Sequence, residues 1–152
     1  MVSRVRIDQN KASLVQSLIF SHDNPEGVFD TYADVMAFAA AVGKKYDYRL
    51  PLETIAQEPN PISYDIFISR GYDLLVDVLT IMTMGNLDFL SDENSSQERR
   101  ITLFEQYANG GLSYLQEQLT GAIDYQERLL LLLDKERHTP KVSQEFDLSR
   151  FL

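Results

Sequence analysis

Two aspartates are the residues of this 152-residue chain whose spacing comes closest to a catalytic pair. Asp73 and Asp77 lie four residues apart in YDLLVDVLTIMTM, so a helix places both carboxylates on one face. Such a pair can share a proton or hold a divalent cation, because like charges held close raise the pKa of one group. The simpler interpretation is that both face solvent or pair with cations such as Arg70. We therefore predict neither a metal site nor a metal-dependent enzyme, and keep the latter as an alternative.

Other residue types that carry chemistry are sparse. The chain has two histidines, His22 and His138, far apart in sequence, and no cysteine. Zinc sites usually need several nitrogen or sulfur ligands, and thiolate chemistry needs cysteine. The glycine-rich nucleotide-binding loops and the G-x-S-x-G motif are absent as well. We expect a protein without a cofactor that is not an enzyme.

Six basic residues form a candidate nucleic-acid site. The 14 basic and 23 acidic residues give a net charge of −9, which opposes simple attachment to polyanions. The basic residues are nevertheless concentrated in two segments, Arg4, Arg6 and Lys11 near the N-terminus and Lys44, Lys45 and Arg49 further on. If the fold brings these segments together, they form a phosphate-binding patch. Solvated surface charge is the simpler interpretation, so nucleic-acid binding is the alternative function.

Apolar residues near the C-terminus form a candidate partner-binding surface. The run Leu129 to Leu133 holds too many leucines for one helical stripe, so it is either deeply buried or part of an interface. The segment after Pro140 ends in large apolar residues that need cover from this domain or from a partner. The candidate partner-binding residues are Leu129, Leu132, Leu133, Phe146, Leu148 and Phe151.

Helical periodicity predicts the elements that position these residues. We expect a single all-α domain of five to six helices over residues 1–138, followed by a tail at 139–152 that is docked or binds a partner. The second helix has the clearest boundaries, because Thr31 and Asp34 have capping-box spacing and Gly43 can end the helix in a left-handed conformation. Residues 46–61 contain three prolines and predict a long ordered loop.

The later elements are predicted less sharply. Residues 62–68 alternate like a strand, but no partner strand is evident, so we favour a helix. The segment 72–84 is apolar nearly all round and predicts a central buried helix. The segment Ser95 to Glu98 offers a capping box for the next helix. Together with the second helix and residues 72–84, the segment 112–134, with Gly121 as a weak point, is expected to form the core.

Three stretches resemble the family called Dnd (DNA phosphorothioation) system-associated protein four. They are VFDTYADVMAFAAAVGKKYDYRLPL, PISYDIFISRGYDLLVDVLTIMTMGNLDFLSDE and RRITLFEQYANGGLSYLQEQL. The most distinctive pieces are FAAAVG and EQYANGGL, the latter containing Tyr107, Asn109, Gly110 and Gly111. The residues themselves predict that the helix ends at Ala108 and turns at Asn109 to Gly111, with a ligand site as the alternative.

The resemblance implies an accessory role in a bacterial DNA phosphorothioation modification or restriction system, and so in anti-phage defence. It brings no established catalytic residues to this sequence. Sulfur transfer and iron–sulfur chemistry need cysteines that this chain lacks, so it does not resemble the modifying enzyme. The implied partners are protein components of that system, by protein–protein interaction. DNA contact and a homo-oligomer stay open.

The N-terminal segment bears on where the protein works. It places Asp8, Gln9, Asn10 and Lys11 ahead of its apolar stretch and has no small-residue cleavage site, unlike a secretory signal. No apolar run approaches the about 20 residues of a membrane span. We therefore expect a cytoplasmic protein with no membrane contact.

Overall fold

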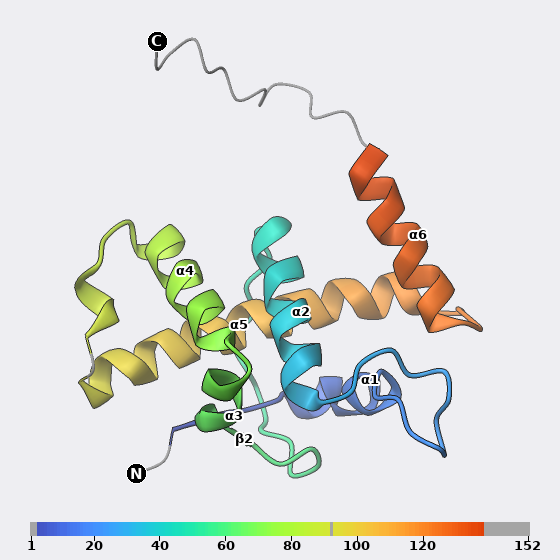
Figure 1. Cartoon of the computed structure of the whole chain (residues 1–152), viewed down its shortest axis with the longest axis horizontal. Helices are drawn as coiled ribbons and strands as arrows, with labels where there is room; N and C mark the ends of the chain where they lie inside the picture. The colour runs from blue at the N-terminus through green and yellow to red at the C-terminus, as the bar shows by residue number, and fades with distance from the viewer. Residues whose placement is uncertain (1–2, 92, 139–152) are drawn as a thin grey trace, which may run out of the picture.

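The computed structural model of this chain, which describes residues 3–91 and 93–138, is mostly α-helical (Figure 1). This confirms the predicted fold class. The described elements are, in order, β1 Arg4–Val5, the 3-10 turn η1 Gln9–Lys11, α1 Ala12–Ser17, α2 Tyr32–Lys45, β2 Ile62–Ser63, α3 Tyr64–Ser69, α4 Tyr72–Met84, the 3-10 turn η2 Asp88–Leu90, α5 Asn94–Leu119 and α6 Tyr125–His138. The long helix α5 runs behind α2, which lies between α4 and α6 (Figure 1).

The packing of α2 on α5 is the closest helix contact. A Cβ atom added at Gly111 would lie 1.7 Å from the backbone oxygen of Ala39, and one added at Gly43 would lie 2.0 Å from that of Tyr107. Neither distance is physically possible, so the two backbones touch where side chains are absent. The neighbouring Ala39 and Ala108 are fully buried. Small residues therefore set the distance between the two helices.

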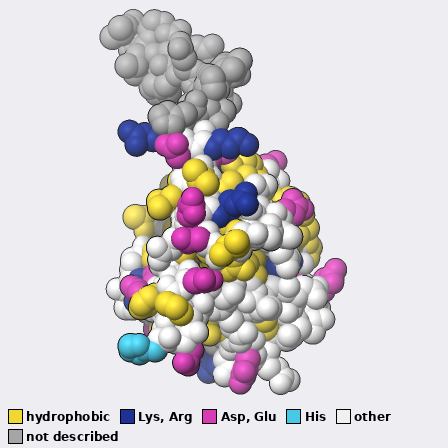
Figure 2. Space-filling model, turned by 90° about the vertical axis from the view of Figure 1, so that its right-hand side faces the viewer, with side chains coloured by type: hydrophobic (Ala, Val, Ile, Leu, Met, Phe, Trp, Pro, Cys, Tyr) yellow, Lys and Arg dark blue, Asp and Glu magenta, His cyan; other side chains and the backbone are white. Residues whose placement is uncertain are grey.

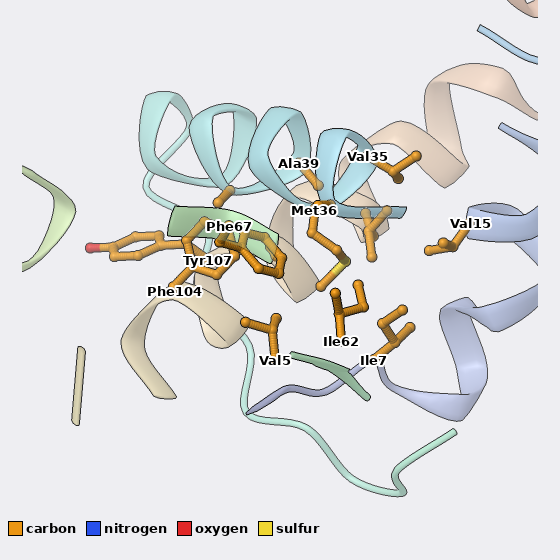
Figure 3. Close-up of a cluster of buried hydrophobic side chains, with 14 of the residues drawn as sticks. Val5, Ile7, Val15, Val35, Met36, Ala39, Ile62, Phe67, Phe104 and Tyr107 are labelled. Atoms are coloured by element: carbon orange, nitrogen blue, oxygen red, sulfur yellow. The ribbon is translucent and has the colours of Figure 1, made fainter. Parts of the chain in front are cut away.

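The hydrophobic core extends from this crossing to the N-terminal strand. Figure 3 shows Val5, Ile62 and Phe104 converging beneath α2. Phe67 of α3 packs edge-on against Phe104 of α5, with ring centroids 5.5 Å apart. The core thus joins elements from both ends of the described chain.

The start of α2 is as predicted, but its end is not. The amide of Asp34 donates to Thr31 Oγ1 at 3.3 Å and the amide of Thr31 donates to Asp34 Oδ2 at 3.2 Å, which is a complete capping box. The prediction that Gly43 ends the helix is wrong, because α2 continues to Lys45. Gly43 serves the close approach to α5 instead.

The predicted break at Asn109 to Gly111 is also wrong. Helix α5 passes through these residues without interruption, so Ala108 is not a helix end. A Cβ atom at Gly110 would lie 1.9 Å from the backbone oxygen of Tyr48, so this glycine admits the loop that follows α2. The chain breaks at Gly121 instead, where φ is +79°, and the expected segment 112–134 is therefore two helices.

Two shorter corrections concern strands and caps. Residues 62–63 do have a partner strand, because β2 pairs antiparallel with β1 in the register Arg4 to Ser63 and Val5 to Ile62. A two-residue strand gives too short an alternation to identify its partner from sequence. Helix α5 begins at Asn94, one residue before the predicted capping box, and no side chain caps it.

The long loop of residues 46–61 is held by the N-terminal segment. Asp8 accepts from the amide of Glu53 at 2.8 Å through Oδ2 and caps η1 through Oδ1. The amide of Ala56 donates to the oxygen of Ile7 at 2.8 Å. This loop is the ordered one that the sequence predicts.

Candidate functional site

The leucine run of α6 divides into buried and exposed residues. Leu129 is buried and Leu132 packs against the core, so these two attach the helix to the body. Leu130, Leu131 and Leu133, which we call the α6 leucines, are each more than half exposed. The prediction offered deep burial or an interface as the two possibilities, and the structure rules out deep burial of the whole run.

The end of the molecule that carries α6 is chemically mixed. Hydrophobic side chains lie between acidic and basic ones on this face (Figure 2). The helix is fixed to the end of α2 by Lys45 Nζ, which lies 2.9 Å from Glu136 Oε2, and by a hydrogen bond from the Tyr46 hydroxyl to Glu136. The Tyr46 bond, followed by the Lys45 contact, holds the pKa of Glu136 below its usual value. The α6 leucines are therefore presented on a helix that is held by Glu136 near its C-terminal end and by Leu129 and Leu132 in its middle.

A second apolar surface lies on α4, where the sequence predicted burial. Leu74 is 68% exposed and Met82 is 60% exposed, with Val78 between them and half-buried Ile81 alongside. These four residues, which we call the α4 outer face, share one side of the helix because they are spaced three or four apart. Only Val76, Leu79 and Thr80 are buried. The prediction of a buried central helix is therefore wrong for this element.

Asp77, one member of the aspartate pair of α4, has a structural role. Asp77 Oδ1 lies 3.3 Å from Arg100 Nε, and Arg100 also donates to the backbone oxygens of Phe89 and Ser91. Burial raises the pKa of Asp77, and the charge of Arg100 opposes this effect. Arg70, the expected partner, instead pairs with Asp34 at 3.0 Å. Among residues 3–91 and 93–138, no group of three or more His, Asp or Glu is placed to hold a metal ion.

The six predicted cations do not form one patch. Arg6 is bound by buried Glu105, which accepts from its amide, Nε and Nη2 at 2.6 to 3.0 Å and raises the pKa of Arg6. Lys11 is buried in η1, and Lys45 pairs with Glu136 at the far end of α2. Lys44 and Arg49 both lie near the ring of Tyr107.

Arg4 and Arg49 flank the same stretch of α5. One open hollow is lined by Ser3, Arg4 and Arg6, and a neighbouring one by Arg49, Met84 and Arg99. Both hollows include Glu98 and Thr102 of α5, so they adjoin along that helix. We call Arg4, Arg49 and Arg99 the arginine face. Arg99 was missed by the sequence analysis, because nothing in its local sequence distinguishes it from Arg100.

The Tyr107 to Gly111 element is explained by packing. The Tyr107 hydroxyl lies 2.9 Å from Thr83 Oγ1, and Lys44 and Arg49 lie 5.5 and 5.9 Å from the centre of its ring. Asn109 Nδ2 donates to the oxygens of Leu50 and Pro51 at 3.3 Å. The element thus holds the end of α2 and the loop that follows it. Its residues therefore have a structural role.

The remaining predicted site residues, Phe146, Leu148 and Phe151, lie outside the described residues, as does the predicted tail. No helix in the described part of the chain combines the length and the apolar character that crossing a bilayer requires.

Comparisons with known proteins give one result. A family model described as DNA sulphur modification system-associated protein 4 matches residues 4–151. No curated protein and no solved structure matches the chain.

Proposed function

Because the chain belongs to the DNA sulphur modification system-associated protein 4 family, we propose that it is a non-enzymatic accessory that binds a protein component of such a system. We propose that it acts in the cytoplasm, where the DNA is, in DNA modification or restriction and so in anti-phage defence. The α6 leucines carry the proposal, because three long apolar side chains are held outward on an anchored helix.

The exposed apolar surface is the physical basis for partner binding. Soluble monomers rarely leave contiguous apolar patches uncovered, and such patches mark interaction sites. A specific interface buries about 1,200 to 2,000 Å² in total, which is more than the side chains of one short helix supply. We therefore propose that the partner covers the α6 leucines together with the exposed part of Tyr46, which Glu136 joins to α6.

The non-enzymatic assignment is supported by the chemistry of the residues present. The chain has no cysteine to carry sulfur as a thiolate or persulfide. Asp77, one half of the only predicted carboxylate pair, is occupied by Arg100. Tyr107 and Asn109, the polar residues of the family element, are used in packing the loop and helix α4.

Co-purification tests the proposal. The tagged chain is expressed in a host that carries its own DNA sulphur modification system, and the proteins that co-purify are identified by mass spectrometry. We expect a modification or restriction component to be enriched with the unaltered chain. The double variant Leu130→Gln/Leu133→Gln should lose that enrichment at least tenfold, because both changes replace exposed apolar contact with a good helix former.

A matched control shows whether the loss of binding is specific to the α6 leucines or follows the removal of any exposed apolar side chain. Ile123, between α5 and α6, is 87% exposed, so Ile123→Gln makes the same kind of change off the α6 helix and should leave enrichment unchanged. The double variant Val78→Gln/Met82→Gln tests whether the α4 outer face contributes to partner binding. The proposal fails if no system component is enriched, and the α6 assignment fails if only the α4 pair abolishes enrichment.

A further inference from the structure

We propose that the arginine face, formed by Arg4, Arg49 and Arg99 around Thr102 of α5, binds the phosphate backbone of DNA. This site differs from the six-residue patch expected from the sequence, because Arg6, Lys11 and Lys45 are engaged elsewhere. It also uses a surface away from α6, and so goes beyond the protein-binding function proposed above.

The three arginines are free to bind an anion. Within the described part of the chain, none of them has a carboxylate oxygen within 4.0 Å, whereas Arg6, Arg70 and Arg100 are each paired with one. All three side chains belong to exposed residues. A phosphate would therefore bind without first breaking an internal ion pair.

Two of the arginines are also oriented by aromatic rings. The Arg49 guanidinium lies 5.9 Å from the centre of the Tyr107 ring, and the Arg99 guanidinium lies 5.5 Å from that of Phe89. A guanidinium over a ring keeps the N–H groups at its edge available, and its restricted motion lowers the entropy lost when a phosphate binds. Lys44, over the same Tyr107 ring, adds positive charge beside Arg49.

The fold brings these cations together from distant parts of the sequence. Arg4 comes from β1, Arg49 from the loop after α2 and Arg99 from the second turn of α5. Their two hollows adjoin at Glu98 and Thr102, so cations stand on both sides of one exposed strip of helix. An elongated polyanion has the shape that such a strip would contact.

The uncharged residues favour nucleic acid over an acidic protein. Ser3, Ser95, Thr102 and Gln106 line the same hollows, and their side chains are of the types that donate to phosphate oxygens. Among the described residues that line these hollows, Met84 is the one exposed large apolar side chain. Hot spots of protein interfaces are enriched in tryptophan and tyrosine as well as arginine, and no aromatic side chain is among the described residues that line these hollows.

Negative charge opposes the binding of DNA at this site, locally and over the whole chain. Glu98 lies between the arginines, and the whole chain carries a net charge of −9. We therefore expect weak binding without base preference, seen best at low ionic strength. Removal of the charge of Glu98 should strengthen binding, which is a gain that a purely structural role for these residues does not predict.

Fluorescence anisotropy with a labelled 20-base-pair duplex tests the site in 20 to 200 mM NaCl. Three phosphate contacts predict a slope of log K against log salt of about −2.7, or a roughly 40-fold loss of affinity between 50 and 200 mM. Arg49→Gln and Arg99→Gln should each weaken binding and reduce the slope by about 1. Glu98→Gln should raise the affinity. Arg128→Gln, at an exposed position of α6, makes the same charge change as the arginine variants and should lower the affinity far less.

Circular dichroism melting of each variant shows whether the fold is retained. The proposal is overturned if no saturable binding appears at 20 mM NaCl, or if Arg128→Gln weakens it as much as Arg49→Gln does. It is also overturned if poly-glutamate competes as well as duplex DNA at equal charge, since the site would then prefer an acidic polypeptide. Each of these outcomes leaves the co-purification result for α6 unaffected.

Discussion

The α2–α5 crossing and the two outer helices α4 and α6 use apolar residues in opposite ways. At the crossing, glycine and alanine let two backbones touch, and the residues there are almost completely buried. In α4 and α6, long aliphatic side chains are abundant, yet many of them are exposed. Small residues therefore mark the closest helix contact of this fold, whereas the leucine-rich stretches of α4 and α6 are buried on one side only.

The physical reason is the number of sides from which each helix is covered. Helix α5 is covered by α2, α4, β1 and α1, so even its polar residues Glu105 and Asn109 are buried. Helices α4 and α6 lie at the two ends of the row in Figure 1 and are covered on one side. Apolar residues on their outer sides stay partly exposed and are available for a partner.

The largest expected effect is at the crossing itself. Gly111→Ala places a carbon 1.7 Å from the backbone oxygen of Ala39, so one helix must move. Overpacking of a core costs about 1 to 3 kcal/mol, and we expect the upper end or more, because the contact is with backbone. Urea denaturation measures the loss in the free energy of unfolding.

Gly121→Ala is the matched control. Nothing lies within 4 Å of a Cβ atom there, but φ is +79°, so the expected cost is the strain of a left-handed residue, about 1 to 2 kcal/mol. Gly111 lies within α5 without a positive φ, so alanine there brings no such strain, and a loss no larger than that of Gly121→Ala would show that the two helices can separate at little cost.

Charged residues also differ between the interior and the surface, because a buried charge needs its partner more than an exposed one does. Arg6→Ala leaves Glu105, which is 1% exposed, with only the amide of residue 6 as a partner. Breaking a buried ion pair costs about 3 to 5 kcal/mol, and we expect about 3, because Arg6 itself is partly exposed. Thermal and urea unfolding measure the loss.

Glu105→Gln added to Arg6→Ala should recover part of that stability, because it removes the uncompensated buried charge. In contrast, Arg128→Ala on α6 should change the free energy of unfolding by less than about 0.5 kcal/mol. If the double variant is no more stable than Arg6→Ala, the loss comes from detachment of β1 rather than from the buried charge.

Two adjacent leucines of α6 allow a buried and an exposed side chain to be compared within one helix. Leu129→Ala removes a buried side chain at the edge of the core and should cost about 2 kcal/mol, the low end for such changes. Leu130→Ala, one residue along, removes an exposed side chain and should cost less than about 0.5 kcal/mol while weakening partner capture. Urea denaturation and co-purification separate the two. Similar losses of stability would mean that the α6 leucines are covered within the protein.

The sequence predicts the fold class and the start of α2 because both depend on local signals. Helical periodicity and the spacing of Thr31 and Asp34 need no knowledge of distant residues. The Asn109 to Gly111 element is different, because glycine has two properties. The prediction used its tolerance of positive φ, whereas the fold uses its lack of a side chain against Ala39 and Tyr48.

The candidate sites are predicted only in part for a related reason. Composition alone shows that α4 and the leucine run of α6 are apolar, but which side is covered depends on neighbours placed by the fold. The arginine face joins Arg4, Arg49 and Arg99 across about 95 residues of sequence. Arg99 lies over the ring of Phe89 at the surface, whereas its neighbour Arg100 is buried and paired with Asp77. Their helical positions, one facing out and one facing the core, decide this difference.

The smallest expected effect concerns how α4 is held beside α2. Asp34 accepts from the Tyr72 hydroxyl at 2.6 Å and from Arg70 at 3.0 Å, which joins the start of α2 to the start of α4. Burial opposes ionisation of Asp34, but the hydrogen bonds from Tyr72 and Thr31 and the charge of Arg70 outweigh it, so its pKa is lowered. A carboxylate whose pKa is lower in the folded state stabilises the fold above its unfolded pKa, near 3.9, and this contribution is lost as pH falls through the folded value.

Asp34→Asn should therefore cost about 1 kcal/mol at pH 7 and progressively less than that below pH 4, as the native carboxylate becomes protonated. The difference in free energy of unfolding between the native chain and the variant, measured in urea from pH 7 to pH 3, gives this curve. The Gly111→Ala penalty should not change over the same range, because it is steric. A constant Asp34→Asn penalty down to pH 3 would show that the hydrogen-bond geometry, rather than the charge, holds α4 beside α2.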